Sequence, residues 1–154
     1  MAHAAHVYML IRRPAQDVLE AFIDPATLRR FWLKDASGRL SKDKWETWEF
    51  MVPGVTAPTR FKAYEPGRRL VIEWPEDETA EITAQPRPDG VTRIDIRSAV
   101  AGKTTEELVS RINDTTYGYC IVLCNLKTLL ENGRSANLVE DQAKLIVEDG
   151  KPSG

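Results

Sequence analysis

The stretch "YGYCIVLCNLKTLLENG", from Tyr117 to Gly133, decides the fold. Its apolar residues recur every three or four positions, which is the spacing of one face of an α-helix. This apolar stripe consists of Tyr119, Val122, Leu123, Leu126, Leu129 and Leu130. Gly133 follows Asn132 and is typical of a helix C-terminus. The stretch predicts a long amphipathic helix whose apolar face must pack against another surface.

That surface is predicted by residues 38–100, which consist of consecutive strands with short turns between them. In "RRLVIEWP", Leu70, Ile72 and Trp74 alternate onto one face of a strand. The pair Asp89 and Gly90 is a strong hairpin signal. Such closely spaced strands must pair antiparallel, because parallel neighbours need long crossover connections. We therefore expect a curved antiparallel sheet of about six or seven strands, wrapped around the long helix.

The N-terminal part predicts one strand and two short helices. "HVYMLIRR" alternates as a strand does, and Pro14 then leads into a helix through "AQDVLEAFI". In "DPATLRRFW", Asp24 can cap a second helix and Pro25 suits its first position. Further along, the threonines and glutamates of "TTEELVSRI" favour a short helix that leads into the long one. The predicted fold class is therefore α+β.

The domain organisation follows from these elements. We predict one domain over residues 1–133 and a C-terminal extension over residues 134–154. In the extension, Asn137 and Glu140 resemble a capping box, which favours a short helix before a structureless end. The alternative is a loose arm used for self-association, so a homodimer is one of the expected assemblies.

Composition excludes several classes of function. The chain has 154 residues, of which 42% are hydrophobic and 29% are charged, as expected for one globular domain. A net charge of -2 offers no excess of cations for nucleic acid phosphates. The longest apolar run, "CIVLC", is far shorter than the ~18 residues of a membrane-spanning helix. The N-terminus lacks the features of a signal peptide, so we expect a cytoplasmic protein.

The two cysteines do not indicate a metal site. Cys120 and Cys124 lie one helical turn apart, where a disulfide would strain the backbone. His3 and His6 are the only histidines, and they lie at the other end of the chain without matching spacing. We therefore expect neither a metal ion nor a cofactor, and we interpret the cysteines as small apolar residues.

The order of elements resembles the START-like (SRPBCC, helix-grip) superfamily. Three motifs are similar to those of bacterial proteins of the activator of heat-shock-protein-90 ATPase homologue-like family. They are "RRPAQDVLEAFIDPATLRRFW", "EPGRRLVIEWP" and "YGYCIVLCNLKTLLENG", which occur in the family's order and span most of residues 7–133. One departure is the segment "SKDKWETWEFMVPGVTAPTR", which lacks the glycine-rich hairpin often found there.

The resemblance implies a cavity between the sheet and the long helix that takes a small hydrophobic or amphipathic molecule. The residues that we expect to line it are mostly aromatic, and each large ring removes much surface from water. They are Trp32, Trp45, Trp48, Phe50, Phe61, Trp74, Tyr117, Tyr119, Cys120, Cys124 and Asn125. Asn125 and Tyr117 would orient the ligand by hydrogen bonds. The alternative interpretation is that these residues simply pack the core.

Charged residues near such a cavity would be needed for catalysis. Glu49, Glu73 and Arg97 are the candidates, because a carboxylate beside apolar rings has a raised pKa and can act as a base. The alternative is that they are solvated charges on the outer face of the sheet. No histidine falls in the predicted sheet or long helix beyond the first strand, and no phosphate-binding loop is present. The sequence therefore leans against an enzyme.

Three functions remain as hypotheses. The first, which we favour, is non-catalytic binding of a small hydrophobic molecule, in a stress or regulatory role. The second is an enzyme similar to polyketide cyclases or dehydratases, in which a pocket carboxylate or tyrosine moves a proton. The third, suggested by the name of the family, is a module that interacts with a chaperone.

Overall fold

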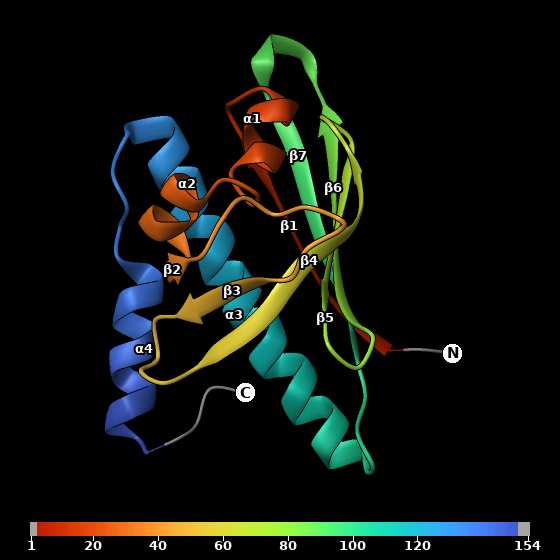
Figure 1. Cartoon of the computed structure of the whole chain (residues 1–154), viewed down its shortest axis with the longest axis vertical. Helices are drawn as coiled ribbons and strands as arrows, with labels where there is room; N and C mark the ends of the chain where they lie inside the picture. The colour runs from red at the N-terminus through yellow and green to blue at the C-terminus, as the bar shows by residue number, and fades with distance from the viewer. Residues whose placement is uncertain (1–2, 151–154) are drawn as a thin grey trace.

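The structure is a computed structural model that describes residues 3–150. It confirms the predicted α+β class, with a seven-stranded antiparallel sheet in the order β1-β7-β6-β5-β4-β3-β2 (Figure 1). In chain order the elements are β1 (His3–Ile11), α1 (Ala15–Glu20), α2 (Pro25–Phe31), β2 (Leu33–Ala36), β3 (Glu46–Phe50), β4 (Thr56–Glu65), β5 (Arg69–Trp74), β6 (Glu78–Pro86), η1 (Pro88–Gly90), β7 (Thr92–Val100), α3 (Thr105–Asn132) and α4 (Leu138–Glu148).

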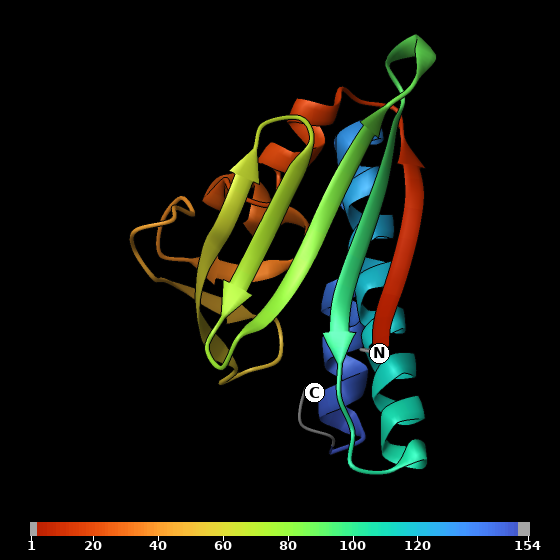
Figure 2. The same ribbon diagram turned by 90° about the vertical axis from the view of Figure 1, so that its right-hand side faces the viewer.

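The sheet is curved, and α3 lies against one of its faces, which we call the inner face (Figure 2). The alternation of side chains along each strand places every second residue on this face. One row of paired residues crosses four strands, and all its members are buried: Leu70, Ile82, Ile96 and Val7. Between β6 and β7, Asp89 and Gly90 both have positive φ, as the predicted Asp-Gly hairpin requires.

Helix α3 confirms the long amphipathic helix and extends it. It has 28 residues, so the predicted short leading helix is continuous with it. At the start, the Thr104 hydroxyl accepts a hydrogen bond from the Glu107 amide, and the Glu107 carboxylate accepts one from the Lys103 amide. At the end, Gly133 adopts the left-handed conformation expected of a C-terminal glycine. The helix packs chiefly on β1, and its N-terminal turns extend past the end of the strands (Figure 2).

The two short helices cover the rest of the inner face. Pro14 precedes α1, and Asp24 caps α2 by accepting a hydrogen bond of 3.1 Å from the Thr27 amide, as predicted. Phe22 and Phe31 are fully buried and meet edge to face, with ring centroids 5.5 Å apart. These contacts join α2 and the turn after α1 to the core between the sheet and α3.

Helix α4 packs on α3 through two buried residues, Val139 and Ala143. Its start differs from the predicted capping box, because Asn137 has a left-handed backbone and its side chain makes no cap hydrogen bond. The Leu138 amide donates instead to Asn125 of α3 over 3.3 Å. The end of the chain, which we expected to be structureless, lies beyond residue 150 and thus outside the described residues.

Candidate functional site

Seven aromatic side chains from the turn after α1, from the end of α2 and from β3, β5 and α3 form a continuous group that we call the aromatic cluster. Its members are Phe22, Phe31, Trp32, Trp48, Phe50, Trp74 and Tyr119. Trp32 lies at its centre, 5.1 Å from Trp48 and 6.2 Å from Tyr119 between ring centroids. Most of these contacts are edge to face, which is a favourable geometry for aromatic pairs. The cluster therefore includes five of the predicted cavity residues.

The members of the aromatic cluster differ in burial. Trp48 is 0% exposed and Trp32 is 8% exposed. Phe50, Trp74 and Tyr119 are only partly buried, and each packs against the core from its edge. We call these three residues the rim. The rim is the part of the aromatic cluster that is partly exposed to solvent.

Two buried hydrogen-bond donors in the aromatic cluster have no acceptor. Among the described residues, neither Trp48 Nε1 nor Trp74 Nε1 has a partner, although both atoms are shielded from solvent. The two rings are neighbours, with centroids 6.2 Å apart. Leaving a buried donor unpaired costs about 1–3 kcal/mol. Buried polar groups in native proteins are nearly always paired, so this pair of donors requires an explanation.

Tyr119 adds a third polar group at the rim. Burial raises the pKa of the Tyr119 phenol to about 12, so the group is neutral and able to donate a hydrogen bond at pH 7. Its ring contacts Trp32, and its position on α3 faces the sheet. The rim therefore combines apolar rings with donors.

Four of the predicted cavity residues lie on the outer face of the sheet, away from α3. Trp45 is 39% exposed, and the Arg60 guanidinium lies 4.2 Å from its ring centroid. Glu73 pairs with Arg60 at 2.9 Å, and Glu49 pairs with Lys34 at 3.4 Å. Arg97 lies opposite His6 and Glu81, also on this face. The structure therefore separates the candidate catalytic charges from the aromatic cluster.

The remaining candidates lie around α3 or on β4. Tyr117 is 58% exposed, Cys120 is exposed and Cys124 is half-buried, where burial raises the pKa of its thiol. Phe61 packs on Tyr64, with ring centroids 5.5 Å apart.

Asn125 is fully buried, but its amide is used within the protein. It donates to the Phe31 carbonyl over 2.8 Å and accepts from the Ser135 hydroxyl over 3.0 Å. The structure thus makes Asn125 a link between α2, α3 and the segment before α4.

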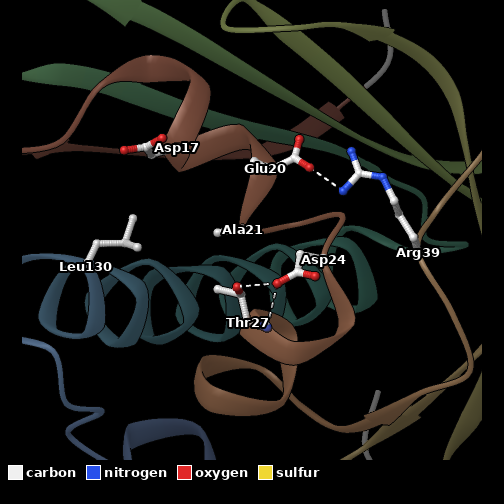
Figure 3. A pocket seen from close by; sticks show the side chains of 7 residues that line it. All are labelled: Asp17, Glu20, Ala21, Asp24, Thr27, Arg39 and Leu130. Carbon is white, nitrogen blue, oxygen red and sulfur yellow. Dashed lines mark hydrogen bonds and ion pairs between the residues drawn. The ribbon is translucent and has the colours of Figure 1, made fainter.

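Two surface hollows lie elsewhere, and neither is the expected cavity between the sheet and α3. The first has a volume of about 220 Å³ and lies between α1, α2 and the end of α3 (Figure 3). Its lining residues are Asp17, Glu20, Ala21, Asp24, Thr27, Arg39 and Leu130. The second is a groove of about 500 Å³ on the outer face of the sheet, lined by Lys62, Ala63, Arg69, Val71, Thr79 and Glu81.

The carboxylates of the first hollow already have partners. Asp17 pairs with Arg13 at 3.0 Å, and Asp24 accepts from the hydroxyl of Thr27 over 2.7 Å. Glu20 pairs with Arg39, which lowers the pKa of the carboxyl (Figure 3). These residues stabilise the connection between the short helices and the loop before β3. Each of the three carboxylates is therefore already engaged within the protein.

Two further kinds of site are not found in the described part of the chain. Residues 3–150 contain no group of histidine, cysteine and acidic side chains arranged to hold a metal ion. Among the same residues, no helix is both long enough and apolar enough to cross a membrane.

Sequence reasoning missed Phe22 and Phe31 as members of the aromatic cluster and Glu78 beside its rim. The phenylalanines fall at helical spacing in the short helices, which is also the pattern of ordinary core residues. Glu78 lies directly opposite Trp74 in the pairing of β5 with β6. Its position follows from the strand register, which the sequence does not show.

Comparison with known proteins supports the fold. No family model matches the sequence, and no curated protein matches it. Protein SSP2350 from Staphylococcus saprophyticus is 21% identical with a TM-score of 0.74, over 86% of this chain and 95% of that chain. The Aha1 dimer from Colwellia psychrerythraea is 16% identical with a TM-score of 0.71, over 86% of this chain and 99% of that chain.

A third similar structure is DynU16, a protein in the dynemicin biosynthetic locus. It is 17% identical, with a TM-score of 0.71 over 86% of this chain. The match covers 48% of the length of DynU16. At these identities the likeness concerns the fold alone. It agrees with the predicted architecture, a curved antiparallel sheet around a long C-terminal helix.

Proposed function

We propose that the protein binds a small hydrophobic or amphipathic molecule at the rim of the aromatic cluster. The observation that carries this proposal is the pair of buried indole N–H groups, Trp48 Nε1 and Trp74 Nε1, without acceptors among the described residues. A ligand that reaches them recovers part of the free energy that the unpaired donors cost. The partly buried rings of the rim supply the apolar contact that such a ligand needs.

Binding at this place requires the rim to move. Neither of the two surface hollows described above lies at the rim, so we infer that the ligand displaces Phe50, Trp74 or Tyr119 from their present positions. These three side chains are the least buried of the aromatic cluster, so their displacement costs less than that of Trp48. The proposal is therefore of binding with local rearrangement of side chains.

The structure favours binding over catalysis by a carboxylate. Glu49 and Glu73 lie on the outer face and form ion pairs there, so neither faces a ligand at the rim. For the alternative of an enzyme similar to polyketide cyclases, Tyr119 is the predicted residue at the rim that carries a titratable proton. Its pKa of about 12 suits a hydrogen-bond donor better than a base at neutral pH.

The third hypothesis, a module that interacts with a chaperone, rests on likeness to the Aha1 dimer, which at 16% identity concerns the fold alone. No contact or surface among the described residues favours it over ligand binding.

A titration with N-phenyl-1-naphthylamine, an uncharged fluorescent aromatic probe, tests the proposal. We expect saturable binding with energy transfer from tryptophan. The Trp74→Ala variant should bind about tenfold more weakly, because it removes a ring of the rim. The matched control is Trp45→Ala, which removes a tryptophan from the outer face and should leave the affinity unchanged. Binding that does not saturate, or equal loss in both variants, would refute the proposal.

A further inference from the structure

We propose that the ligand of the aromatic cluster presents an uncharged hydrogen-bond acceptor, such as a ketone or quinone oxygen, to the indoles of Trp48 and Trp74. This inference rests on the proposed function and adds to it the chemical class of the ligand. It follows from the kind of polar groups at the aromatic cluster and from the charges around it.

The polar groups of the aromatic cluster are hydrogen-bond donors, so a complementary ligand carries an acceptor. An indole N–H can only donate a hydrogen bond, so Trp48 and Trp74 cannot satisfy each other. Both nitrogens are shielded from solvent, and neither has an acceptor among the described residues. The Tyr119 hydroxyl is a neutral donor at the rim. A ligand with one exposed oxygen therefore complements the site, and a pure hydrocarbon leaves the indole donors unpaired.

The charges around the aromatic cluster disfavour an anionic acceptor. Among the described residues, the inner faces of β1, β5, β6 and β7 carry no lysine or arginine, and their ionisable residues are Glu78 and His3. Glu78 lies directly opposite Trp74. A carboxylate or phosphate at the rim would meet this negative charge without a compensating cation.

Two cations on or beside elements that contribute to the aromatic cluster, Arg111 and Lys44, already have partners. Arg111 of α3 donates to the Ala101 carbonyl over 2.8 Å and pairs with Glu107 at 2.9 Å. Lys44 pairs with Glu46 of β3, which shares a face with Trp48. The Glu46 carboxylate also accepts a hydrogen bond from the Ser37 hydroxyl. The donors left for a ligand are thus neutral ones, which match a neutral oxygen.

Three probes with the same ring system separate these possibilities: fluorene, 9-fluorenone and fluorene-9-carboxylate. They differ in having no acceptor, a neutral ketone oxygen or a carboxylate. Binding is followed by the indole N–H signals of the ¹⁵N-labelled full chain, which has four tryptophans that single Trp→Phe variants assign. We expect 9-fluorenone to bind about tenfold more tightly than the other two. We also expect it to shift the Trp48 and Trp74 indole signals downfield and to leave that of Trp45 in place.

The variant Trp74→Phe keeps an aromatic ring and removes one donor. It should reduce the preference for 9-fluorenone over fluorene to about threefold or less, whereas Trp45→Phe should preserve it. Equal affinities for fluorene and 9-fluorenone would overturn the ligand class and leave the proposed function standing. Tighter binding of the carboxylate would likewise overturn it. If none of the three probes saturates, and N-phenyl-1-naphthylamine does not either, the proposed function fails together with the inference.

Discussion

Asp95 shows how a single residue on the outer face connects two strands. Its carboxylate accepts hydrogen bonds from Arg93 on its own strand, at 2.8 and 3.1 Å. His6 Nε2 of β1 lies 2.7 Å from the same carboxylate. The Arg93 hydrogen bonds, supported by His6, hold the pKa of Asp95 below its ordinary value against the opposing effect of burial. The guanidinium of Arg93 also lies over the Tyr8 ring, 4.8 Å from its centroid.

This lowered pKa predicts how the contribution of Asp95 depends on pH. A carboxyl group whose pKa is lower in the folded state stabilises the protein above its unfolded pKa of about 3.9. The contribution is lost as the pH falls through the folded pKa. We expect Asp95→Asn to lower the free energy of unfolding by about 1 kcal/mol at pH 7 and to have a progressively smaller effect as the pH falls through the folded pKa.

Urea unfolding of both proteins at pH 7, 4 and 2.5 measures this difference. Asp43→Asn is the matched control, since Asp43 is exposed and has no ion pair among the described residues. A difference for Asp95→Asn that is equally large at pH 2.5 would show that packing, not charge, accounts for it.

The faces of individual side chains were only partly predictable from the sequence. Trp45 and Trp48 are three residues apart, so alternation places them on opposite faces of a strand, but it does not say which face meets the helix. The structure places Trp48 in the core and Trp45 outside. Asn125 illustrates a second limit, because its role depends on Phe31, 94 residues away. No local pattern encodes such a contact.

At the scale of elements, α3 protects the free edge of the sheet. β1 is an edge strand, and unpaired backbone groups on such strands promote association with other chains. Lys127 Nζ donates to the Leu10 carbonyl over 2.7 Å, and Glu131 accepts from the Arg12 amide over 2.9 Å. Lys127 and Glu131 also pair with each other at 2.7 Å. One ion pair on α3 thus satisfies a carbonyl near the end of β1 and an amide just beyond it.

Replacing Lys127 by methionine tests this protection. The variant keeps the apolar stem and removes the donor to Leu10, so we expect a loss of about 1 kcal/mol of unfolding free energy. Hydrogen exchange at the Arg12 amide should also accelerate, because Glu131 loses the cation that holds it in place. Lys144→Met is the control, as Lys144 is exposed on α4 and its contact with Asp141 is 3.8 Å. Unchanged exchange at Arg12 would show that Glu131 needs no help from Lys127.

At the scale of the whole molecule, the spacing of apolar residues predicted the architecture, because the core consists of one face of a helix and one face of a sheet. The stripe from Tyr119 to Leu130 and the alternation of Leu70, Ile72 and Trp74 each require an opposing apolar surface, and they provide it for each other. The candidate site was less predictable. Whether rings leave a space, and which donors remain unpaired, depends on side-chain packing across four or more elements.

The segment after Gly133 contains α4, and its contribution to the stability of the whole molecule can be measured by removing it. Helix α4 packs chiefly on α3, and its Leu138 and Glu140 contact Asn125. We propose that residues 1–133 form a domain that folds by itself and that α4 stabilises it from outside. A chain ending at Gly133 should then unfold cooperatively, with an unfolding free energy lower by about 2–4 kcal/mol. The loss arises because Val139 and Ala143 no longer cover α3.

Urea unfolding followed by both circular dichroism and tryptophan fluorescence measures this, with a chain ending at Gly150 as the control for length. The two probes should give the same midpoint in the shortened chain, since α4 contributes no tryptophan and no strand. An unfolding free energy equal to that of the control would mean that α4 does not stabilise the domain. A chain without a cooperative transition would mean that the domain boundary lies beyond Gly133, because the covering of Asn125 is then needed for the core to form.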